Sequence, residues 1–134
     1  MHMHGMQPGA RPHIWLVEDD EDMVTLLRFY LEREGYRVTA TTDGRLAKDV
    51  IEGTEPPQLT LLDVMLPYVG GDEVLTHIRR HPVWKGVPVI MLTALSAEHS
   101  IARMLDAGAS DYIVKPFNPQ ELTARVRRFL TPAA

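Results

Sequence analysis

Reactive side chains follow four of the short apolar runs in this sequence, and each run has the length of one strand in a sheet. In chain order these side chains are Glu18 with Asp19, Asp63, Thr93 and Lys115. In an open parallel α/β sheet the carboxyl ends of the strands meet at one edge, and ligands bind in the crevice there. The sequence therefore predicts that carboxylates, a hydroxyl and an ammonium converge at this edge, where they could transfer a phosphoryl group.

The carboxylates of this set indicate a metal site. Carboxylates within about 5 Å of each other repel, and they raise one another's pKa unless a cation lies between them. Oxygen ligands at a solvated crevice favour a hard cation, and Mg²⁺ is typically held by one or two carboxylates together with several waters. Glu21 and Asp22 have a simpler explanation, because acidic residues in the first turn of a helix interact favourably with its dipole.

Strand-like and helix-like patterns alternate along the chain. The predicted strands are 14–17, 37–41, 59–62, 87–92 and 111–114. Apolar residues at helical spacing mark the first four helices: Met23, Leu26, Leu27, Tyr30 and Leu31; Leu46, Ala47, Val50 and Ile51; Val74, Leu75 and Ile78; and Ile101, Met104 and Leu105. Gly35 suits the end of the first helix and Ser96 can cap the fourth, whereas Asn118, Pro119 and Glu121 are typical of a helix start and predict the fifth.

This alternation predicts the fold. Strands that alternate strictly with helices imply a parallel sheet with right-handed crossovers. With five strands, we expect a flavodoxin-like (βα)5 doubly wound α/β fold with the strand order 2-1-3-4-5. The first and third strands are neighbours in this order. Glu18, Asp19 and Asp63 are therefore predicted to lie close together, although they are far apart in the sequence.

Composition and length limit the possible classes of protein. The chain has 134 residues, a formal net charge of -4 and no cysteine, which allows one domain with its own core and excludes disulfides and thiolate metal sites. The negative charge argues against direct nucleic-acid binding, and no apolar stretch approaches the roughly 20 residues of a membrane helix. We expect residues 1–12 to be a disordered leader or a cloning remnant, 13–131 to be the domain, and 132–134 to be a tail or the start of a linker.

Four motifs resemble those of bacterial two-component response-regulator receiver domains, the family to which chemotaxis receivers belong. Within this family the resemblance is strongest to the branch with winged-helix output domains. The motifs are Val17-Glu18-Asp19-Asp20, Leu62-Asp63-Val64-Met65-Leu66-Pro67, Leu92-Thr93-Ala94 and Asp111-Tyr112-Ile113-Val114-Lys115-Pro116-Phe117. The resemblance covers about residues 13–131. It implies a cytoplasmic, phosphorylation-driven switch, whose partner is a sensor histidine kinase. Such a receiver promotes its own phosphorylation and dephosphorylation and is not an enzyme in the usual sense.

The resemblance also implies roles for the acidic residues. Asp63 is expected to be the phosphoacceptor, which attacks the phosphorus of a phosphohistidine on the kinase. Asp19 and Asp63 are expected to bind Mg²⁺ directly, and the backbone carbonyl of Met65 is a further expected ligand. Glu18 is expected to act on the metal through water.

The remaining motif residues are expected to sense the phosphoryl group. Lys115 is expected to contact it, and the peptide bond between Lys115 and Pro116 is expected to be cis. Thr93 and Tyr112 resemble the switch pair of the family. When Thr93 is drawn to the phosphoryl oxygens, the ring of Tyr112 can turn inward into the space that is released.

Two positions near the site suggest a long-lived phosphoryl form. The residues two positions beyond Asp63 and Thr93 are Met65 and Leu95, and in receivers these positions border the phosphoryl group. Apolar side chains there should hinder an attacking water. Alternatively, both residues simply extend the edge of the core.

The fourth helix, fifth strand and fifth helix resemble the output face of the family, through which the winged-helix branch forms homodimers. Charge pairs that match this pattern are Asp111 with Arg125 and Asp106 with Arg127, whereas Ile101 stands where a basic partner of Glu121 is expected. The same charges could instead be solvated, because exposed ion pairs contribute only about 0–1 kcal/mol each.

Other functions fit the residues less well. Phosphatases of the haloacid-dehalogenase type also form an aspartyl-phosphate, but they need a second acid two residues after the nucleophile, where this chain has Met65. A degenerate receiver that only binds proteins would not need the full set of reactive residues. A nucleotide-binding function lacks its glycine-rich loop.

Overall fold

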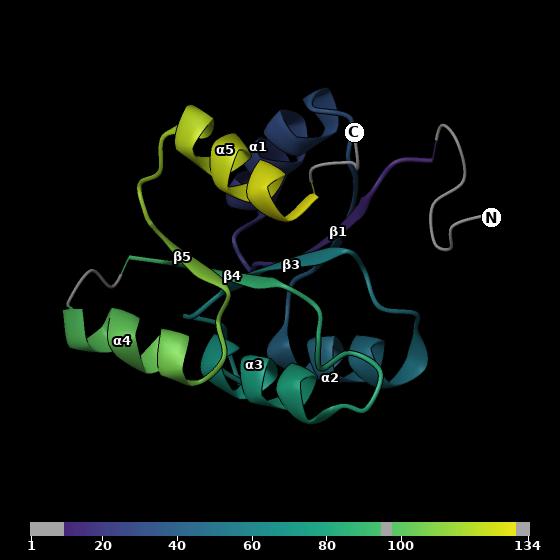
Figure 1. The fold of residues 1–134 in the computed structure, drawn as a ribbon, viewed down its shortest axis with the longest axis vertical. Coiled ribbons are helices and arrows are strands. Elements are labelled where there is room, and N and C mark those ends of the chain that lie inside the picture. Colours follow the sequence, from purple (N-terminus) through teal and green to yellow (C-terminus); the bar gives the residue numbers. More distant parts are fainter. Residues whose placement is uncertain (1–9, 95–97, 131–134) are drawn as a thin grey trace.

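The order of helices and strands in the computed structural model confirms the predicted alternation. The structure describes residues 10–94 and 98–130. Its elements are β1 (His13–Val17), α1 (Glu21–Arg33), β2 (Arg37–Thr41), α2 (Gly44–Gly53), β3 (Leu59–Asp63), α3 (Gly71–Arg80), β4 (Val89–Thr93), α4 (Glu98–Asp106), β5 (Asp111–Val114) and α5 (Pro119–Leu130). The strands form a parallel sheet in the order β2-β1-β3-β4-β5 (Figure 1). The predicted flavodoxin-like topology is therefore confirmed.

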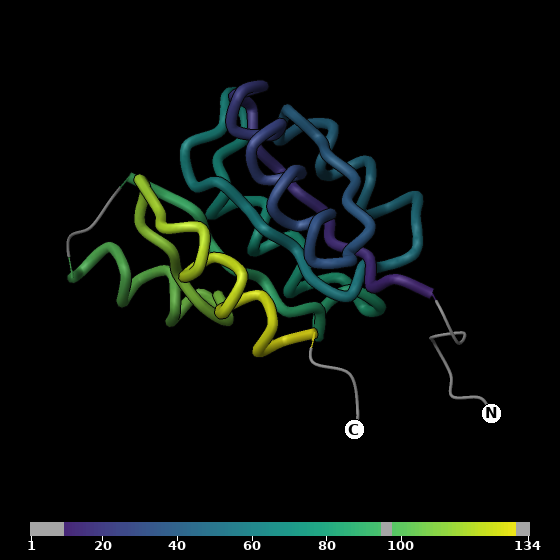
Figure 2. Tube along the Cα trace, turned by 90° about the horizontal axis from the view of Figure 1, so that it is seen from above, coloured from purple at the N-terminus to yellow at the C-terminus, as the bar shows by residue number. Residues whose placement is uncertain are grey.

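Helices cover both faces of this sheet. α1 and α5 lie side by side on one face, and α2, α3 and α4 lie on the other (Figures 1 and 2). Because β3 and β4 are buried along their whole length, their sequences are almost continuously apolar. On the α2 and α3 side, the rings of Trp15 and Trp84 pack edge to face with centroids 5.3 Å apart. No helix in the described ranges is long and apolar enough to span a membrane.

The strand register brings the carboxyl ends of the central strands level. The pairs at this edge are Val17 with Leu62, Asp63 with Leu92, and Thr93 with Val114. Backbone bonds extend the pairing one residue further: the Glu18 N–H donates to the Thr41 carbonyl at 3.0 Å, and the Lys115 N–H donates to the Thr93 carbonyl at 2.7 Å. The reactive residues therefore begin from backbone positions that the sheet holds in place.

In α1, α2 and α4 the buried stripe is narrower than the apolar pattern, whereas all three apolar residues of the α3 pattern are buried. The buried members are Leu27, Leu31, Ala47, Ile51, Val74, Leu75, Ile78 and Met104. By contrast, Leu26, Leu46 and Leu105 are 41%, 52% and 45% exposed. Each of these leucines is the chain neighbour of a buried residue, and one step along a helix turns the side chain by about 100°, away from the sheet.

Two of the predicted helix ends are confirmed. The side chain of Asn118 accepts the backbone N–H groups of Gln120 at 2.7 Å and Glu121 at 3.3 Å, as an N-cap does. Gly35 follows the end of α1 with a φ of +95°, a conformation that glycine adopts without steric cost. The predicted cap Ser96 lies outside the described residues.

The fourth strand begins two residues later than predicted. β4 starts at Val89 rather than at Val87. Pro88 has no N–H and takes part in pairing only through its carbonyl, which accepts the Thr60 N–H at 3.0 Å. The apolar character of this segment thus extends beyond its strand geometry.

The start of α3 packs directly against the end of β3. A Cβ atom on Gly71 would overlap the carbonyl oxygen of Asp63 and lie 2.8 Å from the Cα of Val64. The Gly71 N–H also donates to the Val64 carbonyl at 2.9 Å. Only glycine permits this approach, which fixes the backbone on the C-terminal side of Asp63.

Replacing Gly71 with alanine should destabilise the protein, because the new methyl group meets backbone atoms that cannot move aside. We expect Gly71→Ala to lower the free energy of unfolding by about 2 kcal/mol, the usual scale of overpacking, as measured by urea denaturation. Gly53→Ala is the matched control, since a Cβ there meets nothing within 4 Å. Equal stabilities of the two variants would contradict the close approach.

Candidate functional site

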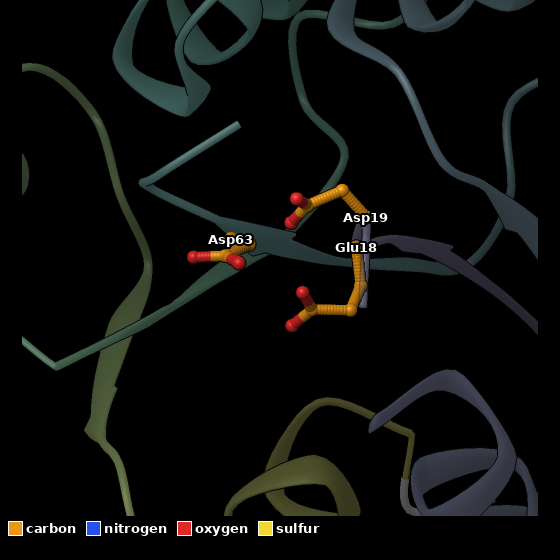
Figure 3. A group of neighbouring side chains, drawn as sticks. All are labelled: Glu18, Asp19 and Asp63. Atoms are coloured by element: carbon orange, nitrogen blue, oxygen red, sulfur yellow. The ribbon is translucent and has the colours of Figure 1, made fainter. Parts of the chain in front are cut away.

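Three carboxylates from two neighbouring strands meet at the carboxyl edge of the sheet. Glu18 and Asp19 directly follow β1, and Asp63 is the last residue of β3. One oxygen of each carboxylate lies within 4.8 Å of the others, and the three side chains point toward one another in Figure 3. Glu18 and Asp63 are only 1% and 4% exposed, whereas Asp19 is open to solvent. The predicted juxtaposition is therefore present.

One ammonium group compensates part of this negative charge. Lys115 Nζ lies 2.8 Å from Glu18 Oε1 and 3.2 Å from Asp63 Oδ2. The peptide bond between Lys115 and Pro116 is cis, as predicted. The site thus has three carboxyl groups and one ammonium, and its oxygen donors suit a hard divalent cation.

Backbone N–H groups orient the two buried acids. Asp63 Oδ1 accepts the Met65 N–H at 3.0 Å, and Glu18 Oε2 accepts the Asp20 N–H at 3.2 Å. The side chain of Asp20 does not join the cluster, because it caps α1 by accepting two N–H groups of the first turn. The third acid of the Glu-Asp-Asp run thus has a structural role, which its position before a helix could have indicated.

Thr93 and Tyr112 lie together beneath the site. Thr93 is fully buried, and the ring of Tyr112, only 8% exposed, is turned into the core against α4. Burial raises the pKa of Tyr112, and a side-chain hydrogen bond with Thr93 partly offsets this shift. The Tyr112 ring therefore already lies inward in this structure, although Thr93 is still hydrogen-bonded to Tyr112.

Burial and mutual charge perturb the ionisation of the central residues. Burial raises the pKa of Glu18 to about 7; the hydrogen bond from Lys115 opposes this shift and Asp63 adds to it. Burial alone would lower the pKa of Lys115, but the hydrogen bond to Glu18 and the charges of Asp63 and Glu18 raise it overall. Without a cation, Glu18 is thus poised between its two protonation states near neutral pH.

A cleft of about 510 Å³ opens beside the carboxylates. Asp19 and Met65 line it on the site side, and Asp72, Arg103 and Tyr112 line it from α3, α4 and β5. The Met65 side chain is 64% exposed, and its predicted companion Leu95 lies outside the described residues. Asp72 and Arg103 were not predicted, because their approach to the site depends on how α3 and α4 dock and no local motif marks it.

The charges predicted for a dimer face make contacts within one chain. Arg125 NH1 lies 3.0 Å from Asp111 Oδ1, and Arg125 Nε lies 3.1 Å from Glu121 Oε2. Arg127 NH2 lies 3.9 Å from Glu34 Oε1 at the end of α1. Asp111 and Arg125 therefore neutralise each other within a single chain.

Comparison with known proteins gives one consistent family. The protein family described as "Response regulator receiver domain" matches residues 14–127 of this chain. The chain is 44% identical over 117 residues to the alkaline phosphatase synthesis transcriptional regulatory protein PhoP of Bacillus subtilis, a match that covers 87% of this chain and 48% of PhoP. It is 37% identical over 119 residues to the response regulator SaeR of Staphylococcus aureus, covering 89% of this chain and 50% of SaeR. The chain thus spans about half the length of these relatives.

Two solved structures of similar shape are receiver domains. One is the receiver domain of the sensor histidine kinase PA1611 from Pseudomonas aeruginosa, which has a magnesium ion coordinated in its active-site cleft. It is 33% identical to this chain, with a TM-score of 0.82, and the match covers 92% of this chain and 100% of that one. Another is the BeF3-activated N-terminal receiver domain of RstA from Klebsiella pneumoniae, at 37% identity and a TM-score of 0.79 over 90% of this chain and 99% of that one.

The stability of the metal-free protein should fall as the pH rises from about 4.5 to 7. The pKa of Glu18 is raised from 4.5 to about 7 in the folded protein, so the folded state binds the proton more tightly than the unfolded state. The resulting stabilisation is complete below the unfolded pKa and is lost as the pH rises through the folded pKa. At about 1.4 kcal/mol per pKa unit, the contribution of Glu18 to the free energy of unfolding should decrease by roughly 2–3 kcal/mol.

Urea denaturation in the presence of a chelator, repeated across this pH range, measures the effect. Glu18→Gln removes the titrating group while it keeps a side chain of similar shape, so its stability should depend less steeply on pH. Parallel pH profiles of Glu18→Gln and the unchanged protein would refute the assignment to Glu18.

Proposed function

Because the chain belongs to the response regulator receiver domain family, we propose that it is a phosphorylation-driven signalling switch in which Asp63 accepts the phosphoryl group. The arrangement of Asp63 carries this proposal: it is a buried carboxylate that contacts Lys115 and faces two further acids. The phosphoryl donor in this proposal is the phosphohistidine of a sensor histidine kinase. A cytoplasmic location suits such a partner and is compatible with a chain that has no cysteine.

The acidic cluster is proposed to hold Mg²⁺. Asp19 and Asp63 would bind the ion directly, the Met65 carbonyl would add a third protein ligand, and Glu18 would act through water. This set of donors fits Mg²⁺, because all of these groups offer oxygen and one oxygen of each carboxylate lies within 4.8 Å of the others. Bound there, the ion would neutralise charge that builds up when a phosphoryl group approaches a carboxylate.

In the proposed transfer, three residues of the chain have defined parts. The Asp63 carboxylate attacks phosphorus, so that an O–P bond forms as the P–N bond of the phosphohistidine breaks. Lys115 already lies 3.2 Å from Asp63 Oδ2 and is positioned to take a phosphoryl oxygen. Thr93, on the neighbouring strand, supplies a hydroxyl for a second oxygen. To do so, Thr93 must exchange its bond with Tyr112 for one with the phosphoryl group.

This exchange is the proposed switch. Tyr112 then loses a hydrogen-bond partner inside the core, and its contacts with α4 are free to change. The signal would leave through the α4–β5–α5 face. Such a two-state element, biased by a local change in charge, is what phosphorylation switches use.

The proposed homodimer through this face depends on activation. Asp111 and Arg125 already pair within one chain, so exchange of this pair between two chains would gain little energy by itself. Formation of the dimer therefore requires that phosphorylation first rearrange the face. The net charge of -4 supports the further proposal that this chain does not bind nucleic acid directly.

Replacement of Asp63 by asparagine should abolish phosphoryl uptake. In the unchanged protein, incubation with acetyl phosphate and Mg²⁺ should add one base-labile phosphoryl group, which mass spectrometry can locate at Asp63. Asp63→Asn should remain unmodified. We also expect this variant, without metal, to gain about 1 kcal/mol in free energy of unfolding, since one of three repelling carboxylates is removed. Modification of Asp63→Asn would contradict the assignment of Asp63 as the phosphoacceptor, and destabilisation of this variant would contradict the argument from carboxylate repulsion.

The phosphoryl form should be long-lived. The apolar side chain of Met65 stands at the mouth of the site and cannot orient a water for attack on phosphorus. Once the phosphoryl donor has been removed, the phosphorylated protein should therefore persist for many minutes. Mass spectrometry can follow its decay. Met65→Asn should shorten this lifetime because its amide can hold a water. Loss of the phosphoryl group from the unchanged protein within seconds would disprove the idea.

A further inference from the structure

The segment that follows the phosphoacceptor is held from outside by the start of α2. We call residues 64–70, between β3 and α3, the acceptor loop. A Cβ on Gly44 would overlap the carbonyl oxygen of Val69 and lie 2.8 Å from its Cβ. The first residue of α2 therefore touches the acceptor loop, four residues after Met65, whose carbonyl is proposed to bind the metal.

One residue of the acceptor loop has an unusual backbone conformation. Tyr68 has a φ of +68°, in the left-handed region that bulky residues rarely adopt. Such a conformation persists where surrounding contacts fix it, and it is common near functional sites. The Tyr68 side chain is 75% exposed, so burial in the core does not account for its position.

The guanidinium group of Arg45 makes the contact that holds the Tyr68 ring in place. Arg45 Cζ lies 3.6 Å from the centroid of the Tyr68 ring, which is a close cation–π stack. Arg45 is itself fixed by Asp43, since its NH2 lies 2.8 Å from Asp43 Oδ2 and its Nε lies 3.3 Å from both oxygens. Asp43 is the N-cap of α2 and accepts the Arg45 N–H at 2.7 Å. The guanidinium is thus anchored to the end of a helix before it meets the ring.

The other end of the acceptor loop is also tied. The Gly71 N–H donates to the Val64 carbonyl at 2.9 Å, and Lys48 of α2 forms an ion pair with Glu73 of α3 at 2.6 Å. Between these fixed points, the contact of Tyr68 with Arg45 spans the middle of the loop. Leu66 and Val69 of the loop also pack against the core, so loss of this contact would release Tyr68 and the backbone on either side of it, while those two side chains would stay in place.

We propose that Arg45 and Tyr68 form a latch that positions the acceptor loop for Mg²⁺ binding. The inference rests on the proposed function, in which the Met65 carbonyl is a ligand of the ion. Arg45 and Tyr68 are positioning residues and act through the loop backbone. With the latch closed, the carbonyl is preorganised and the ion binds without the cost of ordering the loop.

The sign of the effect separates this role from simple electrostatics. Arg45 carries a positive charge, so any electrostatic effect of removing that charge alone would favour Mg²⁺ binding. Removal of the latch would weaken it. Because an exposed cation–π contact of this kind corresponds to a factor of about two to five in an equilibrium constant, we expect Arg45→Ala to raise the Mg²⁺ dissociation constant by about that factor.

The test is calorimetric titration of Mg²⁺ into the full chain. Tyr68→Asn should weaken binding as Arg45→Ala does, because asparagine tolerates the left-handed backbone but offers no ring. Tyr68→Phe keeps a ring for the stack and should bind as the unchanged protein does. The double variant Arg45→Ala/Tyr68→Asn should bind no more weakly than the weaker single variant, since both changes remove one contact.

Arg33→Ala is the matched control. It removes the same charge and a guanidinium that lies 5.4 Å from the ring of Phe29, at the end of α1 remote from the site. Its dissociation constant should remain unchanged. Arg45→Ala that binds Mg²⁺ as tightly as Arg33→Ala, or more tightly, would overturn the latch.

Hydrogen exchange of the metal-free protein gives an independent readout. In Arg45→Ala and Tyr68→Asn, the Met65 and Gly71 amides should exchange faster, whereas amides of β1 should not change. Unchanged exchange in the loop would also overturn the latch. If the unchanged protein failed to bind Mg²⁺, the proposed function would fail, and the exchange rates would still decide whether the latch holds the loop.

Discussion

Repulsion among three carboxylates at one edge of the sheet is the constraint on which the rest of this structure depends. Two of them are buried, and burial favours neutral forms. The protein offsets this cost with Lys115, which reaches the cluster from the fifth strand and bonds both buried acids. One ammonium cannot balance three acids, so the site remains suited to a divalent cation or, at Glu18, to a proton.

The backbone contributes more than the side chains to holding the carboxylates together. Strand pairing positions the backbone of Glu18 and Asp63, and backbone N–H groups fix the orientation of their carboxylate oxygens. Gly71 lets α3 start directly against the end of β3. Preorganisation of this kind has a cost in stability, because the groups are held together before any ligand separates their charges. Part of the remaining structure, including the buried apolar strands, compensates for it.

The sequence was sufficient to predict the fold and the meeting of the acids, because both follow from alternation and strand order. It was sufficient for the cap at Asn118, which depends on residues within one turn. It could not predict that Leu26 faces solvent, since an apolar pattern does not show how wide the buried stripe is. Nor could it pair Arg45 with Tyr68, because that contact depends on a backbone conformation that no local motif of this sequence indicates.

The position of Tyr112 gives the proposed switch a physical route from the site to the surface of the molecule. Its side chain bonds Thr93 beneath the site, while its backbone N–H donates to the Asp111 carboxylate at 2.8 Å. The same carboxylate accepts Arg125 of α5. In the proposed switch, a movement of Tyr112 would therefore disturb Asp111, the residue that ties β5 to α5, so that the site and the outer face would share one element. Coupling requires a shared element of this kind, and proximity alone does not supply it.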